Sequence, residues 1–595
     1  MTTDPKALVE RAWDELDITG AMRDLARLTR FDRYQASDGI SAAARFVADR
    51  AGAAGLAGVE IRRIPADGRR LFGTYEAPQP WTPRTATLSV SGGTCAVAYP
   101  ADPLSLALHS VSTPDGGVTA PLVPADSGSL SGAVVLLAAY PSPPVLARLV
   151  AGGAIGFAAA VRPDTGAAGR IELPAGTPLF GFSLTADQYA HLSRAASAGR
   201  DVVARVVVDT APATMPVVTA YIPGTSRAPE ILVTAHLCHP APSAGDNASG
   251  VAAALAAGEW LARQHLYQPV RFVWGPEFAG LAAYAAAMRR PGIRAGIEFA
   301  VNLDMVGQDP AICGGPLTVE RTPGHAPHPV DAVVDYCLRT LPAQQRSYSG
   351  AVGCDNWTYR STPFVGASDH AILADRAVGV PAVQIGHWPD RYNHSSADTI
   401  DKIDPQELRR AATVVAATVA AFAVTADRAA ITAIAARHAV AELAACLPDP
   451  GAPPSSPAGW IDPGAADQRA YRIQRCVQRS AGSAYHEMVV AVAAQIGTGA
   501  EPDHDGPVLK RTWPGPFNLR GLLAAAPPEH RGALEALLAE RGRGYALIMA
   551  LAQAIDGATP WSQVVVRAAH EAELPMEHAF ADTVREALLA AGWVA

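Results

Sequence analysis

The chain has 595 residues, of which 49% are hydrophobic and 17% charged, and this is ample for several buried cores. The formal net charge of −8 gives no electrostatic attraction to nucleic acid or to an anionic membrane surface. The seven cysteines are widely scattered and form no C-x-x-C pair, so the sequence favours a reducing compartment over a disulfide framework.

The N-terminal segment is charged throughout and lacks the apolar core of a signal peptide. No uncharged apolar stretch reaches the roughly 20 residues that span a membrane. We therefore expect a cytoplasmic protein that makes no contact with a membrane.

The first part of the chain changes its pattern twice. Residues 5–60 carry apolar side chains at helical spacing, with a second amphipathic run at 40–54. Around residues 66–125 the pattern changes to short strand-like pieces that Gly and Pro separate. Between residues 134 and 212 strands alternate with helices, which predicts a compact α/β module of its own.

Strands and helices alternate again from about residue 216 to residue 425. The predicted strands are residues 230–235, 270–274, 298–303 and 380–385. The predicted helices are residues 249–264, 278–289, 330–341 and 404–423, the last with Pro405 in its first turn. Such alternation is typical of a mostly parallel sheet with helices on both faces, so we assign the chain to the α/β class.

The C-terminal part is predicted to be mainly helical. A Pro- and Gly-rich segment, residues 447–464, fits either a linker or an ordered loop. Residues 505–595 form helical patterns with an apolar end, which resembles a winged-helix module. Residues 541–595 hold four Arg and no Lys against six acidic residues, and this net charge of −2 has the wrong sign for contacts with DNA phosphates.

The tail also carries more apolar side chains than one small module easily covers. These positions are Leu547, Ile548, Leu551, Leu588, Leu589, Trp593 and Val594. Apolar patches often mark interfaces, and closed dimers are the commonest soluble assembly. We therefore expect the tail to act as a dimerisation or lid element and the protein to be a homo-oligomer.

Five polar clusters lie in one order along the middle of the chain, the first four at or just past the end of an apolar run. They are T-A-H-L-C-H-P with His236 and His239, G-D-N-A-S-G with Asp246, F-V-W-G-P-E with Glu277, V-N-L-D-M-V-G with Asp304, and Y-N-H-S-S-A-D-T with His394. Imidazole and carboxylate groups suit zinc at a hydrolytic site. Open α/β sheets bind ligands at the carboxyl ends of their strands. The pattern predicts a metal-dependent hydrolase.

This ordered series resembles the zinc exopeptidase family that contains bacterial aminopeptidase S, aminopeptidase Y and glutamate carboxypeptidase. The resemblance covers about residues 5–60 and 216–425, and the module at about 75–212 resembles the protease-associated insert common in that family. An aminopeptidase-like branch of this family is resembled by three features: the H-L-C-H-P motif, P-E in place of the usual paired Glu, and the winged-helix-like tail. We expect a catalytic domain of residues 1–74 and 213–430, an insert of 75–212, a connecting region of 431–504 and a winged-helix-like domain of 505–595.

The resemblance implies a role for each of the main site residues. It implies that His236 and Asp304 bind a first zinc ion. Asp246 would bridge two metal ions if two are present, since a carboxylate has two oxygens to share, and His394 would bind the second ion. Glu277 would be the general base that takes a proton from a zinc-activated water.

Other residues have competing interpretations. Asp246 also fits a helix N-cap, although Asn247 can fill that position and leave Asp246 free. Asp398 follows His394 closely enough to orient a metal-bound ring. The segment A-S-D-H resembles a family segment near the substrate pocket, so we expect Asp369 and His370 to line that pocket.

Two departures from the family pattern bear on the number of metal ions. The family usually has two consecutive Glu residues, the second of which binds the second zinc, but here Phe278 takes that position. The usual H-x-D becomes H-L-C, with Cys238 in place of the orienting Asp. His239 is the candidate substitute, either as a ligand or as a partner of one. One zinc ion and two zinc ions both remain open.

The leading hypothesis is a zinc aminopeptidase-type hydrolase that cleaves a peptide or amide bond in a small substrate. The same machinery would serve deacylation or amide cleavage of a specialised metabolite. A non-catalytic scaffold that keeps the peptidase fold is the alternative from another class, and a DNA-binding regulator rests on the tail alone. Metal content separates enzyme from scaffold, because a scaffold need not bind zinc.

Overall fold

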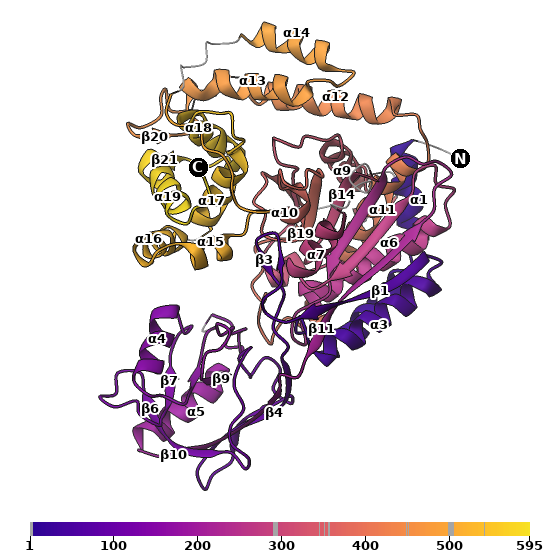
Figure 1. Ribbon diagram of the computed structural model, residues 1–595. Helices are drawn as coiled ribbons and strands as arrows, with labels where there is room; N and C mark the ends of the chain where they lie inside the picture. The colour runs from indigo at the N-terminus through magenta and orange to yellow at the C-terminus, as the bar shows by residue number, and fades with distance from the viewer. Residues whose placement is uncertain are drawn as a thin grey trace.

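Three bodies are visible in Figure 1: an α/β body, a separate sheet domain in purple, and a helical region in orange and yellow. The computed structural model describes residues 4–162, 164–288, 296–343, 345–349, 352–354, 357–447, 449, 451–497, 505–540 and 542–595. Among these residues, no helix is long and apolar enough to cross a membrane.

The main sheet has eight strands in the spatial order β1, β11, β13, β12, β14, β19, β15, β18. Their bounds are β1 (Ala57–Ala66), β11 (Ala213–Ile222), β12 (Glu230–His236), β13 (Val270–Gly275), β14 (Ile297–Leu303), β15 (Leu317–Glu320), β18 (Tyr359–Thr362) and β19 (Ala382–His387). The central strands β13, β12, β14 and β19 run parallel, and β11 and β15 are antiparallel to them at the two sides. The prediction of a mostly parallel sheet is confirmed.

Both faces of this sheet are covered, so neighbouring residues of a central strand lie in different cores. Ile231 and Val233 of β12 lie in one core, and Leu232 lies in the other. The first core is covered by α1 (Pro5–Glu15), α2 (Ile18–Leu28), α3 (Asp38–Ala53), α6 (Gly250–Ala262), α9 (Val330–Arg339) and α11 (Pro405–Ala423). The second is covered by α7 (Ala279–Met288), α10 (His370–Ala374) and the C-terminal helices.

The local sequence explains where α11 begins. Asp404 accepts a hydrogen bond from the N–H of Gln406 over 2.8 Å, and Pro405 occupies the first turn, where its missing N–H has no cost. The predicted helix over residues 404–423 is therefore confirmed, and α11 packs against α1, α6 and α9.

A second sheet of seven strands is inserted between β1 and β11, which pair with each other in the main sheet. Its strands are β4 (Thr82–Val90), β5 (Cys95–Tyr99), β6 (Val118–Pro124), β7 (Val134–Leu137), β8 (Gly156–Ala159), β9 (Phe180–Ser183) and β10 (Asp201–Asp209). The helices α4 (Pro143–Ala151) and α5 (Ala186–Ser197) belong to the same domain. A separate α/β module lies where the sequence predicts one; its kinship with the protease-associated insert stays a prediction.

The connecting region forms a helical layer with its own small core, along the upper edge of Figure 1. Its helices are α12 (Ala429–Ala444), α13 (Arg469–Ser480) and α14 (His486–Ile496). The Pro- and Gly-rich segment contains the short strand β20 (Trp460–Ile461), which pairs with β21 (Met576–Glu577) of the C-terminal region. This pairing favours an ordered loop over a free linker.

The C-terminal region is mainly helical, as predicted. Its helices are α15 (Leu519–Ala525), α16 (Pro528–Leu538), α17 (Arg543–Ala554), α18 (Trp561–Ala572) and α19 (His578–Ala590). The finer assignment to a winged-helix module stays a prediction.

Most of the apolar side chains of the C-terminal region are buried within their own chain. Leu547, Ile548 and Leu551 are 0% exposed and share one core with α7 and α10 of the α/β body. Among the predicted positions, Leu589 is the exception, because its exposed fraction is 46%. The expectation of a broad exposed apolar surface is therefore wrong, because the second face of the main sheet covers it. The homo-oligomer stays a prediction.

Asp375, just after α10, ties the C-terminal region to the α/β body. Its buried carboxylate accepts hydrogen bonds from Arg511 Nη2 at 2.9 and 3.0 Å, and from the Phe517 N–H and Gln553 Nε2 at 3.0 Å each. Charge-assisted bonds of this kind are strong and directional, so one side chain fixes three separate C-terminal segments.

Replacing Asp375 with alanine should lower the free energy of unfolding by about 3–5 kcal/mol, because Arg511 would remain buried without its partner. Denaturant unfolding of the purified protein measures this. The control is Asp401→Ala, which removes an exposed partner of Lys402 and should change stability by less than about 1 kcal/mol. Equal stabilities of the two variants would contradict the anchoring role.

Candidate metal centre

The ends of three neighbouring parallel strands place the candidate site. β12 ends at His236, β13 ends two residues before Glu277, and β14 ends directly before Asp304. His236 is in register with Gly275 of β13. Because the carboxyl ends of parallel strands meet at one edge of the sheet, these side chains converge there, as the sequence predicts.

A buried loop before α6 brings Asp246 to the same edge. The carboxylate of Asp398 accepts hydrogen bonds from the N–H groups of Gly245 at 2.7 Å and Asp246 at 3.0 Å. Asn247 Oδ1 accepts the N–H of Gly250, the first residue of α6, at 3.1 Å. Asn247 therefore serves the helix start and leaves the Asp246 carboxylate free. Asp398 holds the backbone of this loop. Within the described part of the chain, no hydrogen bond or ion pair joins it to a histidine ring.

The first donor group consists of His236, Asp246 and Asp304. His236 Nε2 lies 3.2 Å from Asp246 Oδ1 and 3.2 Å from Asp304 Oδ1. Two ligands about 2.1 Å from a tetrahedral zinc ion lie roughly 3.4 Å apart, which is close to these separations. Asp246 Oδ1 is also buried without a hydrogen-bond partner. A buried carboxylate oxygen without a partner is costly unless a cation compensates its charge, so these residues fit zinc.

The second donor group shares Asp246. Its other oxygen, Oδ2, lies 3.0 Å from His394 Nε2 and 3.5 Å from His239 Nε2. The two rings are stacked, with centroids 5.2 Å apart. The His394 side chain is 46% exposed, whereas that of His239 is 3% exposed. The structure thus brings His239 and His394 together with Asp246, and the solvent-exposed side of the site is the His394 side.

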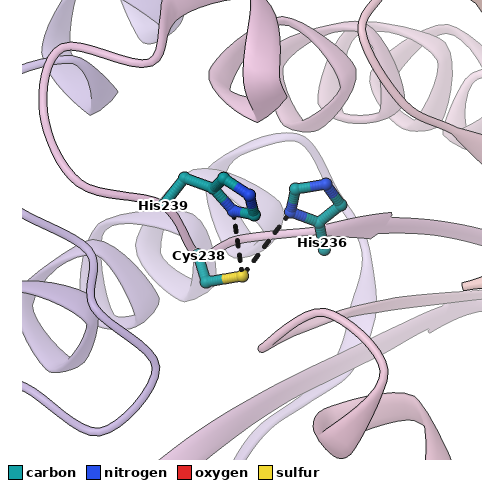
Figure 2. A group of neighbouring side chains, drawn as sticks. All are labelled: His236, Cys238 and His239. Carbon is teal, nitrogen blue, oxygen red and sulfur yellow. Dashed lines mark hydrogen bonds between the residues drawn. The ribbon is translucent and has the colours of Figure 1, made fainter. Parts of the chain in front are cut away.

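Cys238 lies between the two histidines of the H-L-C-H-P motif, as Figure 2 shows. Its Sγ is 3.3 Å from His239 Nδ1 and 3.7 Å from His236 Nδ1. The same sulfur accepts the backbone N–H of Glu277 at 3.1 Å. Cys238 therefore contacts the Nδ1 atoms of both rings, whereas their Nε2 atoms lie near the carboxylates.

Replacing Cys238 with alanine should weaken zinc binding about 10- to 100-fold, the range for losing a group that orients a metal-bound histidine. A zinc titration against a chromophoric chelator measures the affinity. Cys238→Ser retains a hydrogen-bonding atom and should lose less affinity than Cys238→Ala. Wild-type affinity in Cys238→Ala would show that the sulfur does not position the rings.

Glu277 lies beside both donor groups. Its side chain is 17% exposed, and its Oε2 is 3.8 Å from His239 Nε2. Glu277 also groups closely with His236 and Asp304. Burial raises the pKa of Glu277 above its ordinary value. The nearby carboxylates of Asp304 and Asp246 raise this pKa further, whereas His236 and Arg170 lower it. A carboxylate with a raised pKa is suited to accept and return a proton near neutral pH.

Phe278 contributes no donor to the site. Its ring stacks on Tyr75 with centroids 5.8 Å apart, and its N–H donates to Asp369 Oδ1 over 2.6 Å. The backbone of Phe278 has a positive φ of 56°. The side chain at the position of the family's second Glu is thus packed against another aromatic ring.

The two residues predicted to line a substrate pocket are both buried. Asp369 is 2% exposed, and burial raises its pKa to about 7. His370 is 0% exposed, and its Nε2 lies 2.5 Å from Glu320 Oε1. Asp369 accepts the N–H of Phe278, next to Glu277, whereas His370 pairs with Glu320. Their assignment to a pocket stays a prediction.

Charge and burial together favour a cation at this edge. Burial by itself lowers the pKa of His236, yet the carboxylates of Asp304 and Asp246 raise it well above the ordinary value. Burial also raises the pKa of Asp398 to about 7, against the two N–H groups that donate to it. Buried carboxylates that cluster in this way are costly unless a cation or hydrogen bonds compensate them.

Two arginines of the site have no motif in the sequence. Arg33 is 0% exposed and donates from Nε to the carbonyl of Leu237 at 2.9 Å and from Nη2 to that of Ser243 at 3.0 Å. It therefore braces the loop that carries His239. Arg170 of the inserted domain places Nη1 2.7 Å from His239 Nε2. Sequence reasoning missed both, because they come from segments far from the five clusters.

Comparisons with families and with solved structures both give matches. Residues 217–419 match the family model described as Peptidase family M28. The zinc aminopeptidase BSAP from Bacillus subtilis superposes with a TM-score of 0.53 at 16% identity, over 70% of this chain and 96% of its own. A peptidase candidate from Clostridium acetobutylicum gives a TM-score of 0.52 at 16% identity, over 69% of this chain and 81% of its own. A comparison with curated proteins gives no match.

At these identities the similarity to solved structures establishes the fold. The match of residues 217–419 to a peptidase family identifies an enzyme of the metallopeptidase class. The match of residues 217–419 to Peptidase family M28 agrees with the family that the polar clusters resemble.

Proposed function

We propose that the chain is a zinc-dependent hydrolase that cleaves an amide or peptide bond, with His236, Asp246 and Asp304 holding one zinc ion and Glu277 carrying the proton. The observation that carries this proposal is Asp246 Oδ1, which is buried without a hydrogen-bond partner and lies 3.2 Å from His236 Nε2. The match of residues 217–419 to peptidase family M28 supports it.

The zinc ligands and Glu277 would have separate roles in the reaction. Zinc held by the first donor group would polarise the carbonyl of the scissile bond and lower the pKa of a water molecule. Glu277 Oε2 would take a proton from that water and later give it to the leaving nitrogen. The Glu277 N–H is fixed by Cys238, and the next N–H is fixed by Asp369, so the backbone of the proton carrier is held on both sides.

The substrate would enter past His394, because this side chain is the exposed member of the cluster. Both an aminopeptidase and a deacylase of a specialised metabolite are consistent with the same first donor group. The leading proposal is the aminopeptidase type, since the M28 match describes a peptidase family.

A screen with the zinc-loaded protein tests the function. The panel holds free peptides, aminoacyl amides and N-acyl amino acids, each assayed before and after removal of zinc with a chelator. We expect hydrolysis of at least one class, loss of it on chelation and return of it with added zinc. A protein that binds zinc at this site but hydrolyses nothing would instead support a scaffold.

A further inference from the structure

The guanidinium of Arg170 occupies a position among the atoms of the second donor group. Arg170 Nη1 lies 2.7 Å from His239 Nε2, which is a hydrogen-bond distance. The other ring nitrogen, Nδ1, faces Cys238 Sγ at 3.3 Å. With Nδ1 as donor to the sulfur, Nε2 is the acceptor from the guanidinium, because arginine has only donors. The lone pair of Nε2 is then engaged and is not offered to a metal ion.

Without His239, the second donor group is too small for a metal. Asp246 Oδ2 and His394 Nε2, which lie 3.0 Å apart, are the two donors that remain. Catalytic zinc sites use three protein ligands. Phe278, at the position of the family's second Glu, stacks on Tyr75 and adds no donor atom. The residues therefore fit one zinc ion in the first group and do not fit a second one.

Arg170 is held by a contact of its side chain and by a contact of its backbone. Its Nη2 donates to Glu172 Oε2 at 3.1 Å, and its backbone N–H donates to the carbonyl of His394 at 2.8 Å. The preceding residue, Gly169, forms a β-bridge with Ser395. The inserted domain is thus attached to the loop that carries His394, and this attachment brings Arg170 to the metal centre.

We infer that Arg170 takes the place of a second metal ion, so that the chain binds one zinc ion and its inserted domain supplies the second positive charge of the site. Arginine suits this position because it is always charged and its planar group contacts several partners at once. The inference rests on the proposed function, since it takes the first donor group to be the zinc site.

The test is the amount of zinc bound per chain, measured by elemental analysis after equilibration with zinc and removal of the free metal. The wild type should bind one zinc ion per chain. Arg170→Met, which keeps most of the side-chain length and removes the charge, should bind two, because His239 Nε2 becomes available. Two zinc ions in the wild type, or one in Arg170→Met, would overturn the inference while leaving the proposed function intact.

Two further variants sharpen the test. Arg162→Met is the matched control, because Arg162 comes from the same domain and donates to the carbonyls of Asn393 and Arg391 in the same loop. It should still bind one zinc ion, so a gain of zinc there would show that any loosening of the domain opens the site.

His239→Ala keeps the inference testable even where Arg170→Met fails to fold. If Arg170 engages His239, this variant should bind one zinc ion with wild-type affinity, and a large loss of affinity would overturn the inference. A wild type that binds no zinc would overturn the proposed function itself.

Discussion

Replacing Glu277 with glutamine should lower kcat by at least about 100-fold, while zinc content and stability stay at wild-type values. Glutamine has nearly the same shape but cannot accept the proton of the attacking water. Because the proposal assigns the zinc ligands to His236, Asp246 and Asp304 and only the proton to Glu277, the variant should keep the zinc ion. Steady-state kinetics with the substrate class found in the screen measures the effect.

The matched control is Glu230→Gln. Glu230 begins β12 and pairs with Arg271 at the opposite end of the strand from His236. The substitution Glu230→Gln removes the same charge far from the donor groups and should leave kcat unchanged. Equal activity of Glu277→Gln and the wild type would show that another group carries the proton.

Replacing Asp246 with asparagine should abolish zinc-dependent activity and weaken zinc binding by more than about 100-fold, beyond the range for groups that only orient a ligand. Asp246 contributes an oxygen to each donor group, and asparagine replaces one of them with an N–H₂ donor that repels a cation. Zinc at about 100 times its dissociation constant stabilises the wild type by about 2.7 kcal/mol, and this stabilisation should be absent in the variant.

Asp398→Asn provides the graded comparison. Asp398 holds the loop of Asp246 through two backbone N–H groups, so its loss should weaken zinc binding about 10- to 100-fold, less than the loss of Asp246 itself. Thermal unfolding with and without zinc measures both variants. Undiminished stabilisation by zinc in Asp246→Asn would place the metal elsewhere.

The parts of the fold that the sequence predicts are those with a local pattern. Uninterrupted apolar runs such as that of β12 predict buried parallel strands, and the polar residue that follows each run then lies at a shared edge. His236, Glu277 and Asp304 were predicted in this way and converge in the structure. Asn247 at the start of α6 likewise follows from helix-capping chemistry.

The remaining features depend on contacts between distant segments. Arg170 reaches His239 only because the inserted domain is attached to the loop of His394, and no spacing in the sequence indicates that contact. Asp398 binds backbone N–H groups, although its position after His394 favoured a ring. The apolar residues of α17 predicted an exposed interface, but the second face of the main sheet covers them.

Anomalous X-ray scattering at the zinc absorption edge, from crystals of the zinc-loaded protein, tests the zinc site directly and needs no knowledge of the substrate. The proposed function predicts an anomalous peak within about 2.0–2.2 Å of His236 Nε2 and of one oxygen each of Asp246 and Asp304. A zinc-loaded crystal with no peak among these three residues would contradict it.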